Sequence, residues 1–225
     1  YASPQVEDPQ PDEPKPPAAP PEKKMNFWLA VAWSVLVLVI MVGVQTVVIV
    51  PFLVARMVGR SPADLEQVVT ELESDGLVLA IATCCSTLVC VATVVLIVRL
   101  CGWNVRQYVR LQWPAKWSQV VISFALVIAF LAASDGLTYL LGREIVPEFM
   151  VHALESASLP LLVFAVVIAA PVGEEVIFRG FILGNFMPSA GPLMAIVISS
   201  AVWAVIHLQY DLYGIVTVFL GGLLL

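Results

Sequence analysis

Charged residues are scarce in this chain. They make up 12% of its 225 residues, whereas 60% of the residues are hydrophobic. A soluble domain averages about 25% charged and about 45 to 50% apolar residues, so this composition indicates an integral membrane protein. The chain also lacks a basic patch interleaved with aromatic residues, and its net charge is −6. We therefore expect no nucleic-acid partner.

Cysteines are also few, and their spacing is not that of a metal or redox site. Cys84, Cys85 and Cys90 lie in one apolar stretch, Cys101 follows it, and no CxxC pair occurs. Adjacent cysteines rarely bond each other, and free cysteines are often buried as small apolar residues. We predict packing residues here, without a disulfide or a zinc site.

The chain divides into three segments. Residues 1–24 hold eight of the sixteen prolines and are predicted to be a disordered, proline-rich acidic tail, with a partner-binding proline motif as the alternative. Residues 25–118 are predicted to be an N-terminal transmembrane hairpin and a basic loop. Residues 119–225 are predicted to be the functional core. The apolar part starts too late and runs too long for a signal peptide.

Five apolar stretches are long enough to cross a membrane, and a sixth is cut short. The expected spans are residues 27–54, 77–98, 119–141, 159–183 and 192–210, with a truncated span from residue 212. In lipid a helix satisfies its own backbone hydrogen bonds. We therefore predict an all-α, polytopic transmembrane helix bundle.

Loop charges predict the orientation of this bundle. The segment after the second span holds Arg99, Arg106, Arg110 and Lys116 and no acidic residue, and Lys23 and Lys24 precede the first span. Positively charged loops favour the cytoplasm, so we expect a multi-pass cell-membrane protein with a cytoplasmic N-terminus. Trp103, Trp113 and Trp117 flank that same interface as aromatic anchors. Glu174 then lies about 22 Å into the fourth span from outside, toward the cytoplasmic face.

Three charged side chains lie within the fourth span. Glu175 and Arg179 are four residues apart, so they share a helix face and can pair, whereas Glu174 points about 100° away. Charges at membrane depth cost about 2.5 to 3.5 kcal/mol each on translocon scales and usually serve chemistry or transport. We predict Glu174 as a general base, and Pro171 and Gly173 as residues that loosen the helix and admit water.

His207 lies on the next span, 33 residues after Glu174. An antiparallel return of the chain can bring the two side chains to the same depth, where they form a water-activating or metal-binding pair. Structural alternatives stay open: a salt bridge alone for Glu175 and Arg179, and an interhelical hydrogen bond for His207. Asp135 is either a packing group or a second functional carboxylate. Asp211 is a candidate helix cap.

Two segments resemble motifs of the CPBP family of intramembrane proteases, which includes type II CAAX prenyl endopeptidases and bacteriocin-processing or immunity proteins. Glu174-Glu175-Val-Ile-Phe-Arg179-Gly180 resembles the family's EExxxR motif. Trp203-Ala-Val-Ile-His207 is similar to its second motif, an aromatic residue, commonly Phe, and a His separated by three residues. The spacing of 33 residues between Glu174 and His207 also fits.

The resemblance implies a helical membrane hydrolase that cleaves membrane-associated proteins or peptides, including prenylated ones, near the cytoplasmic face. It implies that Glu174 activates water, that Glu175 and Arg179 pair and position, and that His207 holds water or a metal. Glu174 and His207 are the candidate ligands for Zn2+, and a metal-free glutamate mechanism is equally compatible. The partners expected are the lipid bilayer and a peptide or protein substrate.

Two features limit the resemblance. Trp203 stands where Phe is usual. The family's third motif, a His followed four residues on by Asn or a similar residue, lies on a later helix, and Leu225 comes before it. We therefore expect these 225 residues to lack part of the site and to belong to a longer protein. The alternative functions are a non-catalytic immunity or scaffold protein of the same fold, and a proton-coupled transporter using Glu174 and Asp135.

Overall fold

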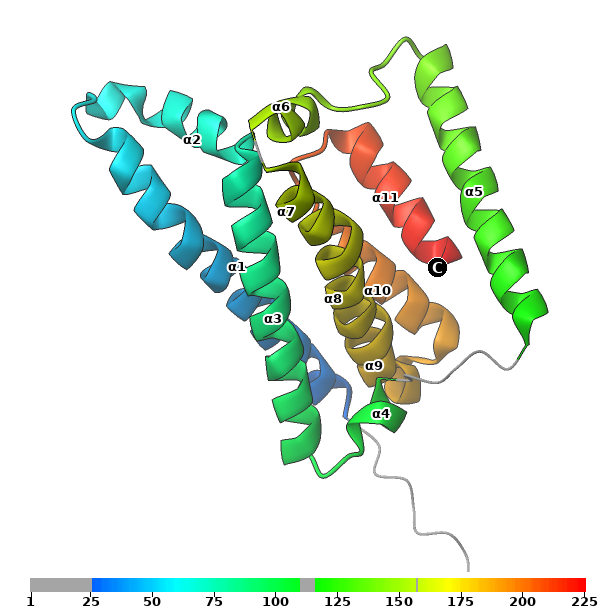
Figure 1. Ribbon diagram of the computed structural model, residues 1–225. Coiled ribbons are helices and arrows are strands. Elements are labelled where there is room, and N and C mark those ends of the chain that lie inside the picture. The colour runs from blue at the N-terminus through cyan, green and yellow to red at the C-terminus, as the bar shows by residue number, and fades with distance from the viewer. Residues whose placement is uncertain (1–25, 110–115, 157) are drawn as a thin grey trace, which may run out of the picture.

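The described part of the chain is helical throughout and contains no strand (Figure 1). The structure is a computed structural model that describes residues 26–109, 116–156 and 158–225. The helices of the N-terminal half are α1 (Phe27–Met57), η1 (Pro62–Asp64), α2 (Leu65–Glu73), α3 (Gly76–Leu100), α4 (Val105–Tyr108) and α5 (Trp117–Leu140). Those of the C-terminal half are α6 (Glu148–Ser156), α7 (Leu159–Val163), η2 (Phe164–Ala169), α8 (Ala170–Glu174), η3 (Glu175–Ile182), α9 (Leu183–Ala190), α10 (Pro192–Val205) and α11 (Leu212–Leu224).

Four helical segments are long and apolar enough to cross a membrane. They are Phe27–Met57, Gly76–Leu100, Trp117–Leu140 and Leu159–Ala190, the last being the continuous run from α7 to α9. The predicted helical membrane bundle is thus confirmed. The predicted fifth span, residues 192–210, contains the 14-residue helix α10, which ends at Val205 before a turn. Helix α11 has 13 residues, so both C-terminal helices are shorter than the other four.

Polar residues begin several of these helices. The Asn26 side chain accepts a hydrogen bond from the backbone N–H of Trp28 and caps α1. Asp75 caps α3 through the N–H groups of Leu77 and Val78, and its carboxylate also pairs with Arg56 at the end of α1. Such caps satisfy backbone donors that the first helical turn leaves without partners. These two caps fix where α1 and α3 begin.

The core of the bundle lies where α1 and α3 pack on the run from η3 to α9. Its largest fully buried side chains include Phe178, Phe181, Ile182, Val37 and Cys90. No disulfide links the four cysteines, all of which lie in described parts of the chain, and Cys90 packs within this core. Helix α10 lies between α9 and α11 (Figure 1).

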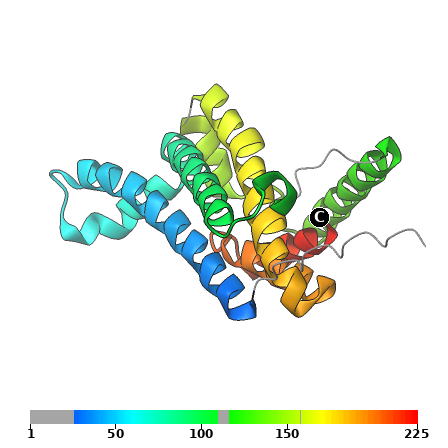
Figure 2. The ribbon, with the colours of Figure 1, turned by 90° about the horizontal axis from the view of Figure 1, so that it is seen from below.

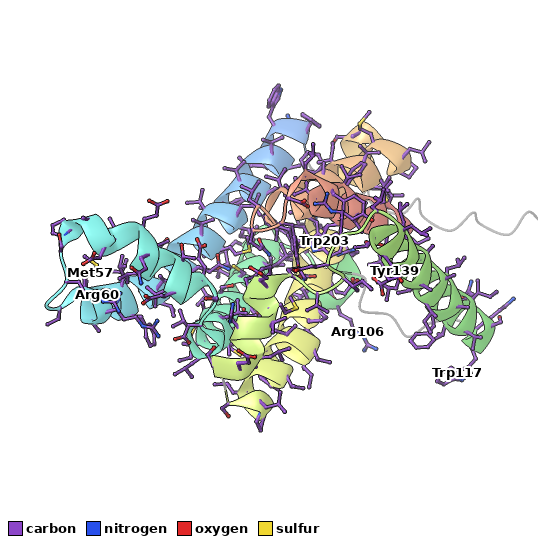
Figure 3. The ribbon with its side chains drawn as sticks, turned by 90° about the horizontal axis from the view of Figure 1, so that it is seen from above. Met57, Arg60, Arg106, Trp117, Tyr139 and Trp203 are labelled. Carbon is purple, nitrogen blue, oxygen red and sulfur yellow. The ribbon has the colours of Figure 1, made fainter. Side chains whose placement is uncertain are left out.

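Helix α5 stands at the edge of the bundle, beside α11 (Figure 2). Thr138 is its only buried residue. The α1–α2 hairpin projects from the opposite side of the molecule, and Met57 and Arg60 lie at its tip, far from Trp117 at the start of α5 (Figure 3). The exposed surfaces of α1 and α5 are apolar, as expected for helices that face lipid.

Two segments expected to be loops contain short helices. Helix α2 buries Val68 and Leu72 against Val78 of α3, and Arg60 pairs with Glu71 at 3.2 Å. Helix α6 carries His152 and buries Ala153. Helices α2 and α6 lie at the end of the bundle opposite α4 (Figure 1). These helices were missed because they are too short to produce a long apolar run.

Several predictions fall partly outside the described residues. The proline-rich tail with Lys23 and Lys24, together with Arg110 and Trp113, belongs to segments 1–25 and 110–115. Arg99, Arg106 and Lys116 are described, and they come from the end of α3, from α4 and from the residue before α5, which share one end of the bundle (Figure 1). The cytoplasmic assignment of that end stays a prediction.

Candidate active site

The helix that carries the charged cluster is irregular on both sides of Glu174. Turns of π-helix, η2 and η3, flank the single turn α8, and Pro171 within α8 lacks a backbone N–H donor. The hydroxyl of Thr87 on α3 donates a hydrogen bond to the carbonyl oxygen of Ala169 at 3.3 Å. π-Helical turns of this kind frequently occur at functional sites. The predicted loosening of the helix is therefore present at Glu174.

Gly173 does not have the role expected for it. It is buried against α3, and a Cβ atom at this position would lie 2.9 Å from Cγ2 of Thr87 and 3.0 Å from its hydroxyl oxygen. The missing side chain thus allows α3 to approach α8 closely, and it does not open a path for water at this point. This contact holds α8 against α3 at the turn whose last residue is Glu174.

Glu175 and Arg179 form the predicted pair. The Nε atom of Arg179 lies 3.6 Å from Oε1 of Glu175. The Arg179 side chain is only 15% exposed and the Glu175 side chain 58%, so the pair runs from the interior of the bundle to its surface. Glu175 is consequently the outer member of the cluster.

Arg179 also contacts the next helix. Its Cζ atom lies 4.5 Å from the ring centroid of Trp203 on α10, a cation–π geometry. The Nη2 atom of Arg179 is buried and has no hydrogen-bond partner in the described part of the chain. The side chain lines a cavity of about 210 Å3 together with Ser199, Ser200 and Gly222. Arg179 therefore links the Glu-Glu-Arg segment to α10.

His207 follows α10 and is held by two interactions. Its Nδ1 atom lies 2.7 Å from the backbone carbonyl oxygen of Trp203. A carbonyl oxygen only accepts hydrogen bonds, so Nδ1 carries the hydrogen, and Nε2 is the nitrogen that can accept in a neutral imidazole. The imidazole also stacks on Tyr210, with 6.0 Å between ring centroids and an interplanar angle of 13°.

Glu174 lies among these groups. It is half-buried, and its carboxylate interacts electrostatically with His207 and Arg179 and is close to the Trp203 side chain. The Trp203 indole Nε1 is buried and makes no hydrogen bond to a described residue within normal bonding distance, so its contact with Glu174 is a loose one. The charge of Glu174 also acts on Tyr210. The fold thus brings Glu174 and Arg179 of the run from α7 to α9 together with His207 of the turn after α10.

Trp203 lies near the middle of the bundle when it is viewed from above (Figure 3). Glu174 is the sixteenth of the 32 residues in the run Leu159–Ala190, so it lies halfway along the segment. The run extends seven residues beyond the predicted end at residue 183. Glu174 thus lies in the middle of this helical run, and its predicted depth toward the cytoplasmic face stays a prediction.

Other polar residues considered from the sequence lie outside this cluster. His152 lies 3.8 Å from Glu155 on α6. Asp211 accepts a hydrogen bond from the N–H of Gly214, which confirms it as the cap of α11, and it pairs with Arg143. Asp135 is exposed on α5 and lines a cleft of about 640 Å3 between α5 and α11.

Residues 155–225 match the family model described as Rce1-like, type II CAAX prenyl endopeptidase. The match supports membership of the CPBP family. The matched segment contains Glu174, Glu175, Arg179 and His207. No curated protein and no solved structure matches the chain.

A catalytic zinc ion in this chain would need suitable ligands. Three protein ligands are usual for catalytic zinc. Among the residues that the structure describes, no three His, Cys, Asp or Glu side chains gather closely enough to hold a metal. Glu174 and His207 form only a pair, so the described residues do not fit a zinc site.

Two residues of this region were missed from the sequence. Thr87 lies on a different helix, and a lone Thr in an apolar run gives no signal of its contact with α8. Tyr210 follows His207 by three residues, which is the spacing of one helical turn, and this spacing is the signal that could have identified it.

Proposed function

We propose that this chain is an intramembrane endopeptidase that hydrolyses peptide bonds of membrane-associated proteins or peptides, prenylated proteins among them. The observation that carries the proposal is the convergence of the Glu174 carboxylate with His207, which lies in the turn after α10. An acidic side chain and an imidazole acceptor at one point suit the activation of water. The family match to residues 155–225 supports the same reaction class.

In the proposed mechanism, Glu174 and His207 hold one water molecule between them. The carboxylate and the Nε2 atom of His207 each accept a hydrogen bond from it, which directs an oxygen lone pair at the scissile carbonyl carbon. Glu174 takes a proton as the water oxygen bonds to that carbon. The C–N bond then breaks as Glu174 returns the proton to the leaving amine. The described residues support no step through a metal.

Glu175 and Arg179 act as positioning residues in this proposal. Glu175 orients the Arg179 guanidinium, and the guanidinium packs on the ring of Trp203. The backbone carbonyl of Trp203 in turn fixes the Nδ1 hydrogen of His207. This chain of contacts holds the His207 ring in place.

The test is cleavage of membrane-anchored peptides by the purified full chain and by Glu174→Gln. We expect Glu174→Gln to lower the cleavage rate by about 10²- to 10⁴-fold, the usual contribution of a general base. Glu66→Gln is the matched control, because Glu66 is an exposed carboxylate on α2 far from the site. A chelator is added in a parallel series, and the proposed mechanism requires that the rate stay unchanged.

Two results would contradict the proposal. Equal cleavage by the Glu174→Gln variant would remove Glu174 from the reaction. Absence of cleavage by a folded wild-type chain across the peptide library would instead favour the immunity or scaffold function, in which the same fold binds a partner without hydrolysing it.

A further inference from the structure

The cleft between α5 and α11 carries an imbalance of charge. Its polar lining includes the carboxylates of Asp135, Glu144 and Asp211 and the guanidinium of Arg143. The positive charge of Arg143 is paired with Asp211, and the Arg143 Cζ atom lies 4.9 Å from the ring centroid of Tyr213. Asp135 and Glu144 make no hydrogen bond or ion pair with a described residue. Two carboxylates in the cleft are therefore uncompensated.

Asp135 is the more informative of the two. It lies five residues before Leu140, the last residue of α5, which is about 8 Å from the end of the span. A charge at such a depth in a membrane helix almost always faces a partner or a water-filled cavity. Here it faces a cleft of about 640 Å3, within the range of about 300 to 1,000 Å3 typical of ligand sites.

The walls of the cleft are apolar and held in place. Leu131, Val146, Met150 and Val218 contribute apolar surface. A hydrogen bond of 2.9 Å between the Thr138 and Tyr213 hydroxyls ties α5 to α11 beneath them. Apolar walls with two fixed negative charges suit an apolar chain that carries a positive charge.

The cleft reaches the candidate active site through Tyr210. Tyr210 lines the cleft, stacks on His207 and interacts with the charge of Glu174. A chain held in the cleft can therefore extend past Tyr210 to the water between Glu174 and His207.

We propose that this cleft is the substrate-binding site for an extended, largely apolar peptide segment with a Lys or Arg side chain, which pairs with Asp135 and Glu144. The proposal rests on the proposed endopeptidase function, and it adds a preference for a basic residue beside the cleaved bond. Charge complementarity favours a basic peptide over a neutral apolar chain. An uncharged occupant would remove water from the carboxylates of Asp135 and Glu144 and would supply no positive charge in its place.

The experiment compares two fluorescent probes: a short apolar peptide with one Lys, and the same peptide with that Lys acetylated. Both are titrated onto the full chain in phosphatidylcholine nanodiscs, with the wild-type sequence and with Glu174→Gln. Because binding is the readout, a failure of hydrolysis leaves this test intact. We expect the Lys peptide to bind about tenfold more tightly than the acetylated one, as for a charge-assisted contact in a poorly hydrated site.

Substitutions in the cleft then test which carboxylates produce the preference for the Lys peptide. Asp135→Asn and Glu144→Gln are expected to reduce or abolish the preference for the Lys peptide and to leave binding of the acetylated peptide unchanged. Asp135→Glu is expected to retain the preference, and Glu66→Gln serves as the carboxylate control outside the cleft. Equal binding of the two peptides by the wild-type chain would overturn the proposal. So would a preference that survives in the Asp135→Asn/Glu144→Gln double variant.

A lipid headgroup is the competing occupant. In nanodiscs that contain phosphatidylethanolamine, a loss of the Lys preference in the wild-type chain would show that a lipid amine takes the cleft, and this would also overturn the proposal. Retention of the preference in both lipids supports a peptide site.

Discussion

The imidazole Nδ1 of His207 lies 2.7 Å from the backbone carbonyl oxygen of Trp203, one turn earlier in the chain. This contact fixes which nitrogen carries the hydrogen and leaves Nε2 free to accept when the imidazole is neutral. A backbone carbonyl cannot be removed by substitution at position 203, so the tautomer is set by the fold of this turn. The chemistry of His207 is consequently tied to the end of α10.

Replacement of His207 tests that assignment. We expect His207→Gln to lower kcat at least about a hundredfold, because one of the two groups that hold the water is lost, with little change in Tm. His152→Gln is the control, because His152 lies on α6 and outside the cluster. Cleavage and thermal unfolding of both variants would be measured together. Unchanged cleavage by His207→Gln would leave His207 as a structural residue only.

We expect the role of Arg179 to require the planar shape of its guanidinium as well as its positive charge. Arg179→Lys keeps the charge but loses the planar group that packs 4.5 Å from the Trp203 ring centroid. We expect a fall in kcat of about tenfold, with a KM close to that of wild type, since the substrate is not contacted. Trp203→Phe keeps an aromatic ring at the contact and should retain more activity than Trp203→Ala. Equal activity of all these variants would contradict the positioning role.

Gly173 and Thr87 should behave as a coupled pair. Gly173→Ala places a Cβ atom 2.9 Å from Cγ2 of Thr87, and we expect it to lower the free energy of unfolding by about 1 to 3 kcal/mol. Adding Thr87→Ala removes the nearest atoms and should recover part of that loss. The measurement is a double-mutant cycle by thermal or denaturant unfolding. Strict additivity of the two changes would show that the contact is not formed.

Tyr108 on α4 should make stability depend on high pH. Burial raises the pKa of its phenol, and the nearby Cys101 adds to the increase. An unperturbed tyrosine has a pKa of about 10, so the folded state favours the neutral phenol. The stabilisation is therefore complete below about pH 10 and is lost as the pH rises above it toward the higher folded pKa.

The substitution Tyr108→Phe isolates this effect. It removes the hydrogen bond that the Tyr108 hydroxyl donates to Asn185, and we expect a loss of about 0.5 to 1.5 kcal/mol at neutral pH. Above about pH 10 the variant should lose less Tm per pH unit than the wild type. Tyr139→Phe is the control, because Tyr139 is 74% exposed on α5. A parallel decline of wild type and Tyr108→Phe would exclude Tyr108 as the cause.

Asp211 combines two roles that different substitutions separate. Asp211→Asn keeps an oxygen that can accept from Gly214 N–H and cap α11, but it loses the ion pair with Arg143. Asp211→Ala loses both, and we expect it to be less stable than Asp211→Asn by about 1 kcal/mol, the usual value of a helix cap. Thermal unfolding of the two variants makes the comparison. If they are equally stable, the cap contributes nothing.

The sequence was sufficient for the class of fold and for the pairing of Glu175 with Arg179. Apolar runs in lipid must satisfy their own backbone hydrogen bonds, so their length alone predicts helices, and four of them reach spanning length among the described residues. The spacing of Glu175 and Arg179 predicted their pairing within one helix. The short helices α2 and α6 escaped prediction because they produce no long apolar run.

Only the tertiary structure decided which helix faces which. In a membrane protein the surfaces that contact lipid and those that contact other helices are similarly apolar, so hydropathy does not identify neighbours. The contact of Arg179 with Trp203, the fit of Thr87 against Gly173 and the cleft that exposes Asp135 all depend on that choice. The sequence determined that charges lie at membrane depth, because their positions in apolar runs are visible. Their partners became visible only when the spans were packed.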